Sequence, residues 1–293
     1  MKWQHLFMAM GVVTIWGVNF SVVKIGLQDY PPILFSGVRF LLVAIPAVFF
    51  IPFPKTSIWY VVVVGVCLGI FKFSLLFLAM KTDISAGLAS LVLQVQVFFT
   101  IGFSIAVFKE SISISQVIGI CCAVLGFIVL FGNSGENVTL VGLLMVASAA
   151  IFWAISNVVM KKMQGVNLLH FFVWISLIPP IPLFILSYIY ETSDPISVIK
   201  SATTTSWFSA LYVSYMSTLL AFAMWGYLLR SYSSATVAPF ALLIPVIGMG
   251  TSWLLLDETI SRYEAVGAVG ILAGLVWCVL GHKVLVKINR EQR

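Results

Sequence analysis

Charged residues are scarce in this sequence of 293 residues. Asp, Glu, Lys and Arg together make up 9% of it, whereas a water-soluble domain carries about 25%. Hydrophobic residues make up 61%. These proportions exclude an ordinary soluble protein and indicate one that lies in a lipid bilayer.

Catalytic and metal-binding groups are also missing from the apolar stretches. The ten acidic residues fall in loops, at the ends of apolar runs or in the tail, the three histidines lie near such ends, and the four cysteines lack ligand spacing. No Gly-Lys-Ser/Thr phosphate loop occurs. We therefore predict no metal, no cofactor and no ATP-driven pump, and carboxylate-based proton coupling is disfavoured. An intramembrane enzyme remains a remote alternative, because no nucleophile has a base nearby.

Apolar runs follow one another almost without a gap. A helix needs about 20 residues to cross the hydrocarbon core, and the short joins carry the charges and prolines. This pattern predicts an all-α membrane protein of ten transmembrane helices, the first of which is not a cleaved signal. The ten predicted spans are Leu6–Val23, Ile33–Ile51, Trp59–Met80, Ser85–Phe108, Ile114–Phe131, Thr139–Met160, Leu168–Tyr190, Trp207–Leu229, Ala235–Leu256 and Tyr263–Val286.

The basic residues predict the orientation. With the N-terminus in the cytoplasm, ten of the sixteen Lys and Arg residues lie on the cytoplasmic side. The positive-inside rule therefore predicts that both termini are cytoplasmic. The net charge of +6 follows from this bias, so no nucleic-acid partner is expected.

The chain contains an internal repeat. Glu110 and Glu258, Gly119 and Gly267, and Gly126 and Gly274 are each 148 positions apart. Each half has five spans, an odd number, so the second half enters the membrane from the opposite side. We predict two inverted five-helix repeats, residues 1–135 and 136–293. Inverted repeats are typical of secondary transporters; a bundle that only scaffolds partners is the alternative.

Several stretches resemble a known family. The segments "WGVNFSVVKIGL", "PPILFSGVRFLLVAIPA", "AGLASLVLQVQVFFTI" and "VAPFALLIPVIGM" are similar to the EamA-type exporters of the drug/metabolite transporter superfamily. The resemblance covers nearly the whole chain. It implies a bacterial inner-membrane exporter of small amino-acid metabolites, with cysteine and O-acetylserine as the leading cargoes. Other amino acids or amphipathic drugs are the alternative cargoes.

Lys72 is the first candidate for the substrate site. It lies inside the third span, about 12 Å from the outer end at Met80 at 1.5 Å per residue. A lysine at such a depth costs about 2.5–3.5 kcal/mol on insertion scales, and its stem leans away from the nearer face. We expect it in a water-filled cavity, where it attracts a substrate carboxylate. A structural lysine held by carbonyls or a glutamine is the alternative.

Further polar and aromatic residues recur at helical spacing inside other spans. Amides and indoles there either line a cavity or join helices to one another. An amide offers both a donor and an acceptor, which suits the two ends of an amino acid. The remaining candidates for substrate binding are Trp16, Asn19, Ser90, Gln94, Gln96, Trp153, Asn157 and Tyr215.

Other features of the spans have plainer interpretations. Arg39 lies near the start of the second span, and we expect it to anchor at the outer interface or to pair with Asp29 or Asp83. The glycines of the fifth and tenth spans predict close helix packing or a homodimer. Pro239 and Pro245 predict a bend in the ninth span.

Overall fold

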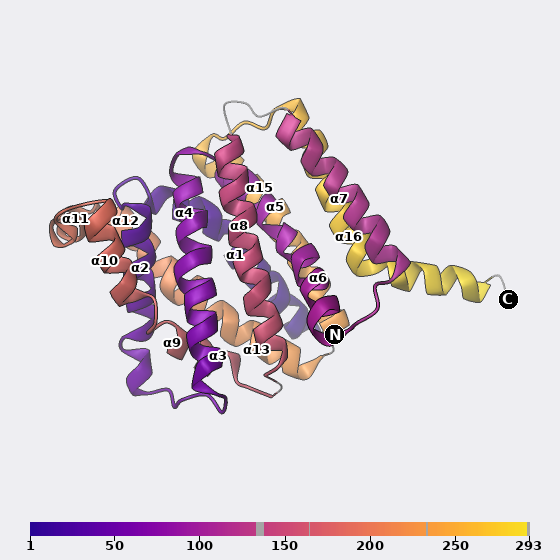
Figure 1. Ribbon diagram of the computed structural model, residues 1–293, viewed down its shortest axis with the longest axis horizontal. Coiled ribbons are helices and arrows are strands. Elements are labelled where there is room, and N and C mark those ends of the chain that lie inside the picture. The colour runs from indigo at the N-terminus through magenta and orange to yellow at the C-terminus, as the bar shows by residue number, and fades with distance from the viewer. Residues whose placement is uncertain (133–137, 164, 233, 292–293) are drawn as a thin grey trace.

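The computed structural model describes residues 1–132, 138–163, 165–232 and 234–291 (Figure 1). Within these ranges the chain is helical and contains no β-strand. Nine apolar helical stretches are long enough to cross a membrane in this part of the chain, and a shorter one covers Ile114–Leu130. All ten predicted spans therefore coincide with helices, which confirms the all-α fold. The predicted boundary between the repeats, at 135 and 136, lies outside the described residues.

The helices of the first repeat are interrupted inside three of its five spans. Two of the interruptions are 3-10 turns and one is a π-helix. The elements are α1 (Trp3–Gly26), α2 (Pro32–Ala44), η1 (Ala47–Phe49), α3 (Ile58–Val64), η2 (Gly65–Lys72), α4 (Phe73–Thr82), α5 (Ala86–Val92), η3 (Leu93–Val95), α6 (Gln96–Phe108) and α7 (Ile114–Gly132).

The second repeat follows the same plan, with one additional short helix, α11, in the loop after its second span. Its elements are α8 (Leu140–Lys161), α9 (Leu168–Ile175), α10 (Pro180–Tyr190), α11 (Pro195–Ser201), α12 (Thr204–Leu211), η4 (Tyr212–Leu220), α13 (Ala221–Ser231), α14 (Ser234–Val237), η5 (Ala238–Leu242), α15 (Leu243–Leu256) and α16 (Arg262–Glu291).

The irregular segments recur at equivalent places of the two repeats. The π-helix η2 lies in the third span and the π-helix η4 in the eighth. The 3-10 segment η3 lies in the fourth span and η5, which contains Pro239, in the ninth. The α-helix is thus interrupted at Pro239, whereas Pro245 lies within the continuous helix α15. The interruption has a counterpart in the first repeat, η3, which contains no proline.

Side-chain caps repeat as well. The backbone N–H of Ser113 donates to Gln116 Oε1 at 2.8 Å before α7, and that of Ser261 donates to Glu264 Oε2 at 2.7 Å before α16. Both are capping boxes, which satisfy backbone amides that a helix start leaves unpaired. These contacts support the repeat inferred from the sequence.

Helices α7 and α16 lie side by side at one side of the bundle (Figure 1). Their glycines face each other. A Cβ on Gly126 would lie 2.7 Å from the carbonyl oxygen of Gly267, and one on Gly119 would lie 2.6 Å from that of Gly274. The small-residue faces thus serve packing within one chain.

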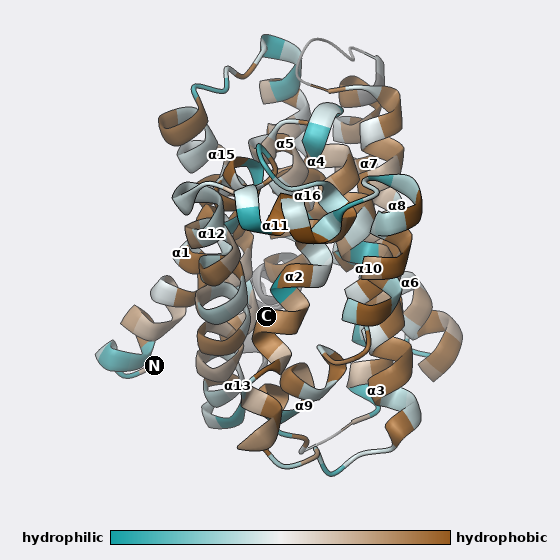
Figure 2. Cartoon of the chain, turned by 90° about the vertical axis from the view of Figure 1, so that its left-hand side faces the viewer, coloured by the Kyte–Doolittle hydropathy of each residue, from teal (hydrophilic) through white to brown (hydrophobic). Residues whose placement is uncertain are grey.

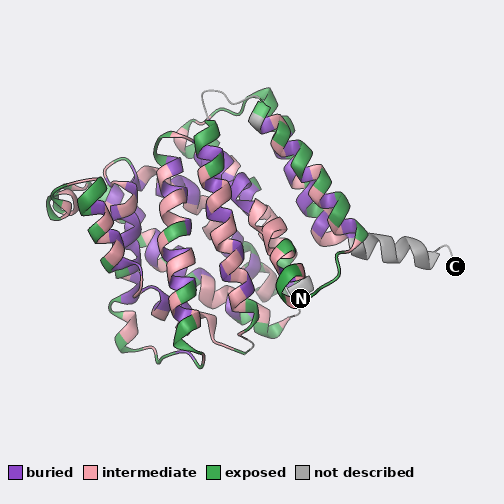
Figure 3. Ribbon diagram, in the orientation of Figure 1, coloured by how far each residue is buried: buried purple, intermediate pink, exposed green. Residues whose placement is uncertain are grey.

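The bundle has two ends, which we call the Asp83 end and the Glu110 end after the loops that contain these residues. Figure 2 shows hydrophilic residues gathered at both ends and hydrophobic residues along the helices. Buried residues lie between the helices, and exposed residues lie on the outer helix faces and in the loops (Figure 3). This distribution suits a bundle surrounded by lipid.

Polar contacts tie the helices together at the Asp83 end. The ammonium group of Lys24 on α1 donates to the carbonyl of Met80 near the end of α4, and Lys81 on α4 donates to the carbonyl of Leu27 just after α1. The carboxylate of Glu191 accepts from the backbone N–H groups of Ile33 at 2.7 Å and Leu34 at 2.9 Å. Helix termini on this side are thus satisfied by side chains from neighbouring spans.

Candidate substrate-binding site

Lys72 lies at the end of η2 and is buried, with 5% of the residue exposed. Its Nζ lies 3.4 Å from the ring centroid of Phe73 and 4.6 Å from that of Trp153. Desolvated cation–π contacts are worth about 2 kcal/mol, but they leave the charge without a counterion. The alternative of a structural lysine required a hydrogen bond from Lys72 to a carbonyl or a glutamine. Among the described residues, Lys72 makes no such bond.

Glycine and proline position the lysine. The π-helix η2 packs against the break between α9 and α10, where a Cβ on Gly65 would lie 2.8 Å from Ile178. Gly69 lies directly against Pro179 at the same break. π-Helical turns are frequent at functional sites, and discontinuous helices commonly form the binding sites of transporters.

Arg39 is also buried at this site, so its predicted role at the outer interface is wrong. The residue is 3% exposed, and its Nη2 donates to the hydroxyl of Thr218 on η4 at 2.9 Å. Its Cζ lies 3.9 Å from the ring centroid of Phe73 and 4.7 Å from that of Phe40. Aromatic rings of α2 and α4 thus surround the guanidinium within the bundle. Among the described residues, no contact joins it to Asp29 or Asp83.

The two cations share the ring of Phe73. Because both distances end at one centroid, the charged groups of Arg39 and Lys72 lie within about 8 Å of each other, a range at which like charges repel in a protein interior. Neither forms an ion pair with a described residue. The side chains of Glu136 and Glu291, two of the ten acidic residues, lie outside the described part. The arrangement attracts an anion.

An aromatic wall adjoins this cationic pair. The indole Nε1 of Trp16 donates to the carbonyl of Ser217 at 2.9 Å, and Ser217 precedes Thr218. The ring of Trp16 lies 5.1 Å from that of Phe222 and 5.3 Å from that of Trp225. This wall offers an apolar surface beside the charges.

An amide cluster lies one turn along α8 from Trp153. The Nδ2 of Asn157 donates to Gln96 Oε1 at 2.6 Å and to Thr100 Oγ1 at 3.2 Å. Asn157 follows Trp153 by one turn of α8, so a continuous strip of α8 faces first Lys72 and then the amides. Trp16, Lys72, Gln96, Trp153 and Asn157 therefore belong to one connected set of polar and aromatic contacts.

Four predicted site residues do not join this set. The hydroxyl of Ser90 donates to the carbonyl of Gly87 in its own helix at 2.6 Å and packs against Gly248. Gln94 donates to the carbonyl of Ala241 at 3.3 Å and so links η3 to η5. These contacts favour helix packing for both. The remaining two are Asn19, whose Oδ1 is buried without a partner, and the half-buried Tyr215, which makes no hydrogen bond or ring contact with the set among the described residues.

The sequence-based prediction missed Arg39 and Thr218. In the sequence, Arg39 and Lys72 are the only charged residues well inside the predicted spans. This shared feature was a signal that they could belong to one site. The distance of Arg39 from the start of its span suggested an interfacial anchor instead. Phe40 follows Arg39 directly on α2, but Phe73 on α4 and Thr218 on η4 are far from it in the sequence, so spacing alone could not find these two contacts.

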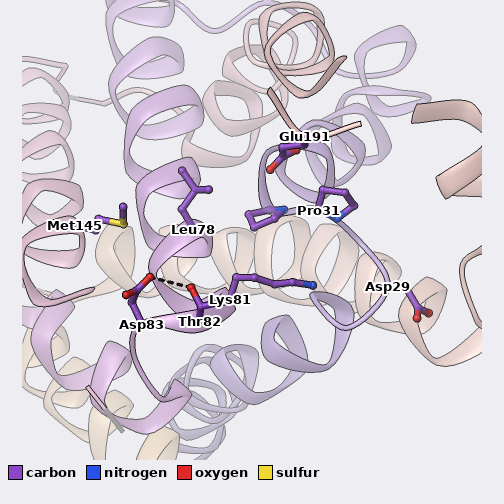
Figure 4. A pocket seen from close by; sticks show the side chains of 9 residues that line it. Asp29, Pro31, Leu78, Lys81, Thr82, Asp83, Met145 and Glu191 are labelled. Atoms are coloured by element: carbon purple, nitrogen blue, oxygen red, sulfur yellow. Dashed lines mark hydrogen bonds between the residues drawn. The ribbon is translucent and has the colours of Figure 1, made fainter. Parts of the chain in front are cut away.

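A separate pocket of about 420 Å³ opens at the Asp83 end and contains none of the predicted site residues. Figure 4 shows Glu191, Lys81 and Asp83 around it. Its carboxylates are already engaged: Asp83 accepts from Thr82 and Thr139, and Glu191 caps α2. The hydroxyl and backbone of Thr203 hold the pKa of Asp29 below its usual range. The pocket is thus bordered by structural contacts.

Two inverted five-helix repeats with charged and polar residues buried between them define a membrane transporter. The EamA-like transporter family matches residues 3–132 and 140–280. The chain belongs to this family, and it is a transporter of small molecules and not an enzyme.

Named relatives agree with this assignment. The chain is 40% identical over 286 residues, 95% of both chains, to a probable amino-acid metabolite efflux pump of Salmonella typhimurium. It is 38% identical over 283 residues, 94% of both, to a protein of the same name from Escherichia coli K12. An uncharacterized inner membrane transporter, YedA of Escherichia coli K12, is 25% identical over 277 residues, 91% of this chain and 88% of YedA. The chain is thus a multi-pass protein of the inner membrane.

A solved structure supports the fold. A protein known only as "Crystal structure of protein" superposes with a TM-score of 0.67 and covers 97% of this chain and 99% of its own. At 16% sequence identity the likeness concerns the fold alone.

Proposed function

We propose that this protein exports small amino-acid metabolites from the cytoplasm by alternating access, and that Lys72 binds the substrate carboxylate. The unpartnered ammonium group of Lys72, buried among rings at the centre of the bundle, carries the proposal. The relatives at 40% and 38% identity, named as probable amino-acid metabolite efflux pumps, support the cargo class. Within that class, cysteine and O-acetylserine are the candidates that the family resemblance implies.

Each part of the connected set has a role in this proposal. Lys72 attracts the carboxylate, and the amides of Gln96 and Asn157 offer donors and acceptors to the polar remainder of the substrate. The wall formed by Trp16, Phe222 and Trp225 holds its apolar atoms. Substrate binding then gives the buried ammonium group a counterion, so it stabilises the charged form of Lys72.

The inverted repeats supply the movement. In alternating access, one half of the bundle rocks against the other around a central site. The contacts at the Asp83 end, where Lys24, Lys81 and Glu258 join neighbouring spans, hold this end closed. With both termini in the cytoplasm, the Asp83 end faces the periplasm and the Glu110 end faces the cytoplasm.

Counterflow into proteoliposomes tests the proposal. Vesicles loaded with one unlabelled amino-acid metabolite are given a labelled one, and Lys72→Gln is compared with Lys200→Gln, a substitution at an exposed lysine of α11. We expect Lys200→Gln to accumulate label like the wild type and Lys72→Gln to lose most of it. A properly folded Lys72→Gln with unchanged transport contradicts the role of Lys72, and transport of no amino-acid metabolite by the wild type contradicts the function itself.

A further inference from the structure

We propose that the cargo is a net anion and that Arg39 is a second residue that binds it. The substrate class is an amino-acid metabolite with more carboxylate than ammonium groups, such as one whose amine is acylated. This class differs from cysteine and O-acetylserine, the zwitterions that the family resemblance implies. This inference rests on the proposed function, because it concerns the same site. It depends on the contact of both Arg39 and Lys72 with the ring of Phe73. The proposed function does not require a second cation at this place.

The net positive charge of the site is the first observation that favours an anionic substrate. Two cations lie within about 8 Å of each other, and no described carboxylate pairs with either. A zwitterionic amino acid would add one negative and one positive charge, so the net charge of the site would stay the same. Its ammonium group would also meet two cations and no described counterion. A substrate that has a carboxylate but no ammonium group avoids this repulsion and lowers the net positive charge of the site.

The unpaired N–H donors of Arg39 are the second observation that favours an anionic substrate. A guanidinium carries five N–H donors in a planar fork that matches a carboxylate. In this structure Nη2 binds Thr218, while Nε and Nη1 are buried without a partner. Donors left unpaired inside a protein are costly, and a carboxylate satisfies two of them at once. Arg39 is therefore prepared for an anion that the described chain does not itself supply.

The position of Phe73 between the two elements is the third observation, because it brings both cations to one place. Its ring contacts both cations, and it joins η2 to α4, immediately after Lys72. The backbone of Arg39 is fixed, since its carbonyl accepts from the hydroxyl of Ser214 on η4 at 3.0 Å. The guanidinium and the ammonium group therefore lie against one ring, so a single substrate carboxylate beside Phe73 can reach both.

A pair of isomers tests the inference. N-acetylserine and O-acetylserine contain the same atoms, but at neutral pH the first is an anion and the second a zwitterion. Purified protein in proteoliposomes is assayed by counterflow with each, and serine methyl ester serves as the cationic third arm. We expect the anion to be transported at least about tenfold more efficiently than the zwitterion, and the ester not at all.

The outcomes separate the two proposals. Equal or better transport of O-acetylserine overturns the anionic cargo but leaves amino-acid export intact. Transport of neither isomer, nor of any other amino-acid metabolite, overturns the proposed function and this inference with it.

Variants of Arg39 test its part. We expect Arg39→Gln to lose the preference for the anion, and Arg39→Lys, which keeps the charge but not the fork, to retain part of it. Thr218→Val leaves the charge in place and serves as a milder change if Arg39→Gln does not fold. Thermal stabilisation of each detergent-purified variant by N-acetylserine gives a second readout. A folded Arg39→Gln with the wild-type preference and wild-type stabilisation shows that Arg39 does not bind the cargo.

Discussion

Glu258 accepts a hydrogen bond from the backbone N–H of Ala86 at 2.8 Å, and its second oxygen accepts from Gly87 at 3.1 Å. The carboxylate that follows α15 in the second repeat thereby caps α5 in the first repeat, at the Asp83 end. The equivalent residue of the first repeat, Glu110, instead pairs with the exposed Lys161 at 2.7 Å. Equivalent glutamates therefore have different partners at the two ends of the bundle, an asymmetry that the proposed alternating access can use.

Glu258→Gln should loosen the Asp83 end. A carboxylate at a helix N-terminus is worth about 0.3–1 kcal/mol, and up to about 2 kcal/mol when partly buried. Its loss should raise the population open at this end several-fold. A cysteine placed at Leu78, in the pocket of Figure 4, and introduced without the four native cysteines, should react faster with a membrane-impermeant maleimide.

Glu110→Gln is the matched control, because it removes the same charge at the other end. It should leave labelling at residue 78 unchanged or slow it. If Glu258→Gln and Glu110→Gln change this labelling equally, the contact between Glu258 and α5 does not close the Asp83 end.

The orientation can be tested on two exposed loops. A cysteine at Lys55 should be protected from an impermeant reagent in intact cells, because the loop after α2 lies at the Glu110 end. A cysteine at Asp194, in the loop after α10, should react. Reaction of both positions, or of neither, contradicts an arrangement in which these loops lie on opposite sides of the membrane.

Gly126→Ala should destabilise the protein. The added Cβ would lie 2.7 Å from the carbonyl oxygen of Gly267, so α7 and α16 would have to separate, and such overpacking typically costs about 1–3 kcal/mol. Gly102→Ala is the control, since nothing lies within 4 Å of its added Cβ and alanine favours a helix. Thermal unfolding in detergent should show a lower midpoint for Gly126→Ala alone; equal midpoints would mean that the two helices are not held so closely.

The spans and the repeat could be predicted because they depend on local and periodic features. Ten apolar runs and one constant spacing can be recognised in the sequence without knowledge of any tertiary contact, and the structure confirms them. The surroundings of Lys72 were only partly predictable: its depth followed from its position in the third span, but its contact with Trp153 depends on how α8 packs. Arg39 was misplaced because depth along a helix does not reveal which neighbouring helices provide aromatic rings.

The last prediction concerns the driving force. Among the described residues no carboxylate lies at the centre of a span, so the usual group for exchanging protons is missing there, and efflux should respond weakly to a pH step. An anionic cargo instead moves charge, and one elementary charge across 100 mV is worth about 2.3 kcal/mol. Export of an anion is therefore driven outward by the inside-negative potential of a bacterial cell.

Efflux of N-acetylserine from loaded proteoliposomes should accelerate several-fold when a potassium gradient and valinomycin make the interior negative, because the potential acts on the net charge that is moved. Any efflux of O-acetylserine should not accelerate, since a zwitterion carries no net charge, so this isomer is the control for effects of the potential on the protein itself. The pH is kept equal on both sides in this measurement, and a second series applies a pH step at zero potential. Acceleration by an acidic exterior, with no response to the potential, would show that the transporter exchanges its cargo for protons despite the missing carboxylate.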